Sequence, residues 1–113
     1  MTNIKILTKN NNIVAFTVSG HTGYADFGKD IVCSAISSIV QSACLGIVKV
    51  LEINAVIKRD DKKGFLELKL PKDISQQQLS DAQIVLKTMR LSLEDLLFDY
   101  GEYIKLEVYD EIY

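Results

Sequence analysis

The chain has 113 residues, a formal net charge of −2 and a sequence pI of about 5.3. Hydrophobic residues make up 48% and charged residues 25%, which is typical of a globular protein, so we expect residues 1–113 to form one domain. Binding to nucleic acid through phosphates needs clustered cationic charge. The acidic balance therefore argues against direct nucleic-acid binding.

Two strands and a glycine-rich loop are predicted at the start of the chain. Apolar side chains alternate from Ile4 to Thr8 and from Ile13 to Val18, and Val14, Phe16 and Val18 would share one face of the second strand. The asparagines 10–12 between the strands tolerate the turn conformations of a hairpin. The stretch from Gly20 to Lys29 then carries three glycines, which predicts a mobile loop.

A long, weakly charged helix is predicted from Ile31 to about Leu51, with Asp30 as its N-cap. Because both sides of this helix are nearly free of charge, we expect it to be covered on more than one side, by a second helix, a partner subunit or both. Ser, Cys, Gln and Lys interrupt it, so it should fall short of the roughly 18 apolar residues of a membrane span. We expect no membrane partner.

The second half of the chain repeats the pattern of hairpin and helix. A second hairpin is predicted from Ile53 to Lys58 and Phe65 to Leu70, and its basic pairs 58–59 and 62–63 flank two aspartates, as in a charged turn. Ser75 and Gln78 form a capping box for a helix that ends near Phe98. The last strand is Tyr103 to Tyr109. The order β-β-α-β-β-α-β predicts an α+β fold, with two helices packed on one face of a mostly antiparallel five-stranded sheet.

The two cysteines, Cys33 and Cys44, are predicted to be free thiols. If both lie on one helix they are about 16 Å apart along its axis at ~1.5 Å per residue. A disulfide needs Cα atoms within about 7 Å. Free thiols fit a reducing compartment, and the N-terminus lacks the basic-then-apolar pattern of a signal peptide, so we expect a cytoplasmic protein.

The candidate chemistry lies in the segment from Gly20 to Ser37. His21 is the only histidine, and it directly follows a strand at the start of the glycine-rich loop. Cys33 is the third residue after Asp30, which places its sulfur in the first helical turn, where the helix dipole favours a thiolate. The loop can fold the imidazole over the thiol, and backbone N–H groups near Cys33 are candidates for an oxyanion hole. The alternative is that Cys33 is a small apolar residue of a buried helix, which describes Cys44 better.

The supporting residues stay open at this point. Ser37 lies one turn after Cys33 and either supports the site or bonds back to its own helix. Asp26 and Asp30 are candidates to orient the imidazole, although helix capping is the simpler role for Asp30 and a solvated loop position the simpler one for Asp26. One histidine and two distant cysteines do not make a standard zinc site, and no phosphate-binding loop is present. We expect no cofactor and no metal.

At these residues the sequence becomes recognisable, because GHTGYADFGKDIVCSAIS resembles the signature of the ribosomal-processing cysteine protease family, Prp. That family has a Gly-His pair, a short glycine-containing loop and then Gly-x-Asp-Ile-Val-Cys, followed by small residues and serine. The matching positions are Gly20-His21, Gly28, Asp30 to Cys33 and Ser34 to Ser37. The length and the order of elements also resemble that family across nearly the whole chain.

The resemblance implies a function that the composition does not show. Members are cysteine endopeptidases that remove a short N-terminal extension from large-subunit ribosomal protein number twenty-seven, on which ribosome maturation depends. It assigns a catalytic dyad to His21 and Cys33 and places Asp30 and Ser37 near the nucleophile, without fixing their roles. It further implies a homodimer, and an apolar pocket beside Cys33 for the aromatic residues that precede the scissile bond. The alternative is a non-enzymatic, ribosome-associated dimer that only binds a peptide.

Overall fold

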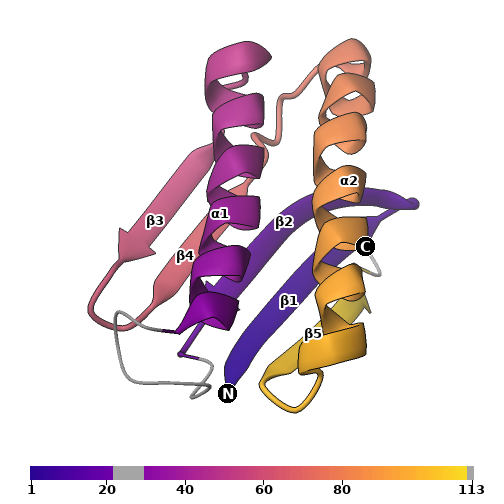
Figure 1. The fold of residues 1–113 in the computed structure, drawn as a ribbon. Helices are drawn as coiled ribbons and strands as arrows, with labels where there is room; N and C mark the ends of the chain where they lie inside the picture. The colour runs from indigo at the N-terminus through magenta and orange to yellow at the C-terminus, as the bar shows by residue number, and fades with distance from the viewer. Residues whose placement is uncertain (22–29, 112–113) are drawn as a thin grey trace.

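The computed structural model describes residues 1–21 and 30–111 and confirms the predicted α+β fold. Five strands form one sheet in the order β3-β4-β2-β1-β5, and the two long helices lie side by side across one face of it (Figure 1). The three pairings β1–β2, β2–β4 and β3–β4 are antiparallel, whereas β5 pairs with β1 in parallel. The sheet is therefore mixed and mostly antiparallel.

The first hairpin joins β1 (Thr2–Lys9) to β2 (Asn12–Ser19). Asn10 and Asn11 form its turn with φ angles of 52° and 65°, a left-handed conformation that asparagine tolerates better than most residues. This confirms the predicted turn chemistry. The register shifts between Leu7 and Thr8, and as a result Ile13 is buried with the side chains of Phe16 and Val18.

This shift makes the predicted alternation of β2 wrong at one position. Val14 is only partly buried, and Ile13 takes the core position in its place. The buried side chain of Gln83 contacts the backbone at this position. Its Oε1 accepts the Ile13 amide at 2.7 Å and its Nε2 donates to the Ile13 carbonyl at 2.9 Å, so both backbone groups of Ile13 are paired by a side chain.

The first helical segment consists of α1 (Ile31–Leu45) followed directly by the π-helical η1 (Gly46–Val50). The predicted helix to Leu51 is thus continuous, but its winding widens in the last turn, where the Leu51 amide donates to the Gly46 carbonyl at 2.9 Å. Val32, Ile36, Val40 and Ile47 belong to the core.

The expectation that this helix is not apolar enough for a membrane span is wrong by length and composition. An 18-residue window within Ile31–Val50 has a mean hydropathy of 2.0, because Lys49 is the only charged residue of this helix and its small polar side chains lower the average little. A helix that packs in a protein core passes the same test. Since 28% of that window is buried in this chain, much apolar helix surface is left open.

The second hairpin starts later than predicted. β3 spans Val56–Asp60 and β4 spans Phe65–Lys69, whereas residues 53–55 are not in a strand. The Ile53 side chain is buried in the core, and its amide donates to the Ile47 carbonyl at 3.0 Å, which ties this stretch to the end of η1 instead of to the sheet. Leu66 and Leu68 are buried on the predicted core face of β4.

The last two elements are α2 (Gln76–Tyr100) and β5 (Ile104–Asp110). The predicted capping box is present, because the Gln78 amide donates to the Ser75 hydroxyl at 3.1 Å and the Gln78 side chain accepts the Ser75 amide. The core between the sheet and the two helices includes Ile4, Ile6, Phe16, Leu68, Leu86 and Leu93, each no more than 1% exposed.

Candidate active site

His21 lies two residues after the end of β2, at the end of the sheet where β1 begins. Gly20 precedes it with a φ of 86°, a backbone conformation that favours glycine. The Gly20 carbonyl accepts a hydrogen bond from the Thr2 hydroxyl at 3.4 Å, and a Cβ on Gly20 would lie 2.9 Å from the Met1 carbonyl oxygen. The start of β1 therefore leaves room only for glycine at this position and fixes the backbone that carries the imidazole.

Cys33 lies in the first turn of α1, as predicted. Asp30 is the N-cap, with an extended backbone, and its Oδ1 accepts the Cys33 amide at 2.9 Å. Asp30 is only 7% exposed, so a buried carboxylate holds the backbone of Cys33 in place. The capping role of Asp30 is thus confirmed.

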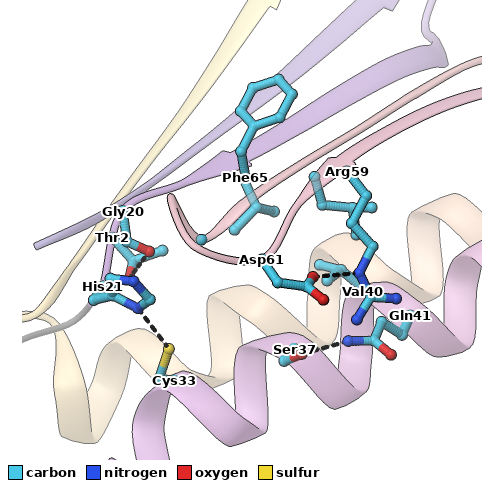
Figure 2. Close-up of a pocket in the computed structure, with 13 residues that line it drawn as sticks. Thr2, Gly20, His21, Cys33, Ser37, Val40, Gln41, Arg59, Asp61 and Phe65 are labelled. Atoms are coloured by element: carbon cyan, nitrogen blue, oxygen red, sulfur yellow. Dashed lines mark hydrogen bonds and ion pairs between the residues drawn. The ribbon is translucent and has the colours of Figure 1, made fainter. Parts of the chain in front are cut away.

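The structure brings the two reactive side chains together. Cys33 Sγ lies 3.8 Å from His21 Nδ1, within the range of a hydrogen bond to sulfur (Figure 2). The imidazole is exposed and the thiol is half-buried, so a substrate can reach both groups. A thiol beside an imidazole, at the amino-terminal end of a helix, is the arrangement that supports nucleophilic attack by sulfur.

The same geometry limits which backbone amides could form the predicted oxyanion hole. The Cys33 amide already donates to Asp30 Oδ1, and the Ser34 amide donates to the Asp30 carbonyl at 3.1 Å. Both amides are therefore used by the helix cap. An oxyanion contact from this helix has to come from an amide other than these two.

Ser37 lies one turn beyond Cys33 and also borders the site. Its hydroxyl accepts a hydrogen bond from Gln41 Nε2 at 2.6 Å, which links two successive turns of α1 (Figure 2). Among the described residues, this contact to Gln41 is the hydrogen bond seen at the Ser37 side chain, and a supporting role for Ser37 stays a prediction.

A pocket of about 160 Å³ opens beside the thiol and the imidazole. Its apolar lining residues include Val18, Val40, Phe65 and Leu66. Arg59 and Asp61 line it from the β3–β4 hairpin (Figure 2). Arg59 Nε donates to Asp61 Oδ1 at 2.5 Å. The pocket thus combines an apolar floor with a charged rim, and it confirms the expected apolar surface beside Cys33.

Cys44 provides the contrast that the sequence predicted. It is half-buried against the core, three turns along the same helix. Burial raises the pKa of the Cys44 thiol above its ordinary 9.0, and the positive charge of Arg59 lowers that pKa by a smaller amount. Both cysteines are free, as expected.

Two predicted supporting residues, Gly28 and Asp26, lie outside the described residues. Within the residues that the structure describes, no group of three or more His, Cys, Asp and Glu side chains is arranged to hold a metal ion.

Comparison with known proteins decides the family. The sequence profile of the family described as cysteine protease Prp matches residues 1–105. The chain belongs to the cysteine protease Prp family. It is 22% identical to the ribosomal processing cysteine protease Prp of Bacillus subtilis over 94 residues, covering 83% of this chain and 84% of the relative. It is 28% identical over 89 residues to the protein of the same name from Staphylococcus aureus, covering 79% and 80%.

Solved structures agree on the fold. The crystal structure of the S. aureus ribosomal processing protease Prp with a covalently linked product peptide has a TM-score of 0.85 at 24% identity, covering 96% of this chain and 99% of that one. The structure of the S. aureus protease with a substrate peptide has a TM-score of 0.80 at 23% identity, with the same coverage. The mixed sheet with two helices on one face is thus the Prp fold.

Sequence reasoning missed one wall of the pocket. Four lining residues come from the β3–β4 hairpin, well after the motif ends at Ser37: Arg59, Asp61, Gly64 and Phe65. The signal available was a charged turn with a glycine, which indicates a hairpin but not what lies beside it. Only the strand order places β4 next to β2 and so brings the turn to the imidazole.

Proposed function

We propose that this chain is a cysteine endopeptidase in which Cys33 is the nucleophile and His21 its acid–base partner, and that it removes the N-terminal extension of large-subunit ribosomal protein number twenty-seven. The observation that supports the dyad is the 3.8 Å contact between Cys33 Sγ and His21 Nδ1 at the capped start of α1. Membership of a cysteine protease family and relatives named ribosomal processing proteases support the reaction and the class of substrate.

The proposed reaction follows from the positions of these two groups. His21 takes the proton of the Cys33 thiol as Sγ attacks the carbonyl carbon of the scissile bond, and the resulting oxyanion collapses as the C–N bond breaks. His21 gives its proton to the departing amine, leaving a thioester on Cys33. A water molecule then attacks the thioester while His21 takes its proton, which releases the carboxylate product and restores the thiol.

The pocket beside Cys33 is the proposed site for an aromatic side chain that precedes the scissile bond. Its volume of about 160 Å³ is close to that of an apolar cavity of roughly 150 Å³ known to bind benzene in another protein. Val18, Val40 and Leu66 supply an apolar surface suited to such a ring. The ring would then bury apolar area next to the nucleophile and position the carbonyl for attack.

We also propose that the chain forms a homodimer through the open face of its helices, and that it is located in the cytoplasm. A groove of about 600 Å³ between the helical segments is lined by Ile39, Val50 and Ile84, of which Val50 is 77% and Ile84 72% exposed. Exposed apolar patches of this kind are typical of protein–protein contacts. Sedimentation equilibrium should give twice the monomer mass.

The proposed cytoplasmic location agrees with the two free cysteines, since a reducing compartment keeps thiols unpaired.

Cleavage of a peptide that spans the junction between the extension and the mature protein tests the proposed activity. We expect wild type to cut the peptide at one bond, and Cys33→Ala to lose at least about 10³-fold in kcat/KM because no nucleophile is left. Cys44→Ala is the matched control, since it removes the other thiol of the same helix. Equal cleavage by wild type and Cys33→Ala would contradict the assignment, and binding without cleavage by wild type would favour the peptide-binding dimer.

A further inference from the structure

The turn between β3 and β4 approaches the imidazole through a glycine. Gly64 has a φ of 60°, and its amide donates to the Asp61 carbonyl at 3.2 Å. A Cβ built on Gly64 would lie 2.7 Å from the Gly20 carbonyl oxygen and 3.1 Å from His21 Cε1. The first distance is shorter than real Cβ contacts, so a side chain here would require the turn or the Gly20-His21 backbone to move.

Neither side of this contact is free to move without loss of other contacts. On one side, the Asp60 carboxylate accepts the amides of Lys62 and Lys63 at 3.1 and 3.4 Å, which braces the turn. On the other side, the Gly20 carbonyl accepts a hydrogen bond from the Thr2 hydroxyl, and the Met1 carbonyl oxygen occupies the space that a Cβ on Gly20 would need. The backbone before the imidazole is therefore enclosed between the start of β1 and the β3–β4 turn.

We propose that Gly64 is a positioning residue for His21: its bare α-carbon lets the β3–β4 turn support the imidazole at the distance from Cys33 that cleavage requires. The effect on cleavage rests on the proposed peptidase function, whereas the effect on the imidazole does not. A methyl group at Gly64 points toward Cε1 and the Gly20 carbonyl, so it displaces the imidazole relative to the thiol. A displacement of about 1 Å is enough to lower the rate by about 10²-fold.

Three variants separate the effect of a Cβ placed against His21 from the effect of backbone strain at residue 64. Gly64→Ala adds a Cβ and strains the positive φ, whereas Gly64→Asn adds a Cβ but suits that φ. Lys63→Ala, in the same turn, is the matched control because it changes a neighbouring side chain and leaves Gly64 intact. Because His21 is the only histidine, one Cε1–H resonance in a ¹H–¹³C spectrum reports on the imidazole alone.

We expect both Gly64 variants to move the His21 resonance and to lose about 10²-fold in kcat/KM on the junction peptide, mainly in kcat. Lys63→Ala should match wild type in both measurements. Should Gly64→Ala not fold, Gly64→Asn carries the test by itself. The proposal is overturned if Gly64→Asn cleaves like wild type, because backbone strain would then explain any loss in Gly64→Ala, or if the resonance stays in place in both variants.

The two measurements keep this proposal apart from the proposed function. A wild-type protein that does not cleave, with a His21 resonance that moves in both Gly64 variants, would overturn the peptidase assignment and support the contact. A wild-type protein that cleaves, with Gly64 variants that cleave equally well, would support the peptidase and overturn the positioning role.

Discussion

The two thiols of α1 have the same chemistry in two different environments. Cys33 and Cys44 are both half-buried and both free, so exposure alone does not distinguish them. Cys33 lies in a capped first turn with an imidazole 3.8 Å away, whereas Cys44 packs against the core, where burial raises the pKa of its thiol. Both thiols are similarly accessible, so their positions along the helix distinguish them: Cys33 has a helix cap and an imidazole beside it, whereas Cys44 has the core.

Removing the imidazole should change the difference between Cys33 and Cys44 the most. We expect His21→Ala to lower kcat/KM on the junction peptide by about 10²–10⁴-fold, the usual contribution of a positioned acid–base group. Iodoacetamide labelling near neutral pH should slow at Cys33 and stay unchanged at Cys44, which mass spectrometry of the labelled peptides would measure. Cleavage at the wild-type rate by His21→Ala would show that the contact between sulfur and imidazole has no catalytic role.

Removing the helix cap should have a smaller effect, on stability as well as on activity. Asp30→Ala deletes the acceptor of the Cys33 amide, so we expect a loss of about 1 kcal/mol in the free energy of unfolding, measured by urea denaturation. Asp30→Asn should retain most of this stability, because asparagine caps helices about as well as aspartate.

The cap of α2 offers a control for this comparison. Ser75→Ala removes a similar N-cap contact, to the Gln78 amide, and neither Ser75 nor Gln78 is among the residues that line the pocket. It should cost a similar free energy, about 1 kcal/mol, and leave peptide cleavage unchanged. Equal losses of cleavage in Asp30→Ala and Ser75→Ala would mean that the cap acts only through global stability.

The smallest predicted effect concerns the pH dependence of Cys44. Because burial raises the pKa of its thiol above 9.0, Cys44 in a Cys33→Ala background should label slowly and continue to gain rate above the pH at which a model thiol levels off. The raised pKa of the Cys44 thiol also makes the free energy of unfolding depend on pH. The neutral thiol is favoured in the fold, so this contribution is complete below the unfolded pKa and is lost as pH rises through the raised folded pKa. Labelling of Cys44 that levels off with a model thiol would contradict this environment.

Local signals predicted much of this fold. The asparagines of the first turn, the Asp30 cap and the Ser75–Gln78 capping box each act within a few residues, and the structure has all of them. The same locality put Cys33 in the first turn of a helix. Two predictions were wrong at points that the local pattern does not show: the register shift between β1 and β2 puts Ile13 in the core position predicted for Val14, and a hydrogen bond ties Ile53 to η1 where β3 was predicted to begin.

The candidates for the chemistry follow from the amino-acid sequence, because it has one histidine, and one of its two cysteines comes three residues after an N-cap candidate. The residues around them depend on how the strands and helices pack. The strand order β3-β4-β2 brings Arg59, Asp61 and Gly64 to the pocket, and the approach of Gly64 to His21 Cε1 depends on two turns that are distant in the chain. Periodicity and capping rules describe neighbours along the backbone, whereas the walls of a site are set by how sheets and helices pack.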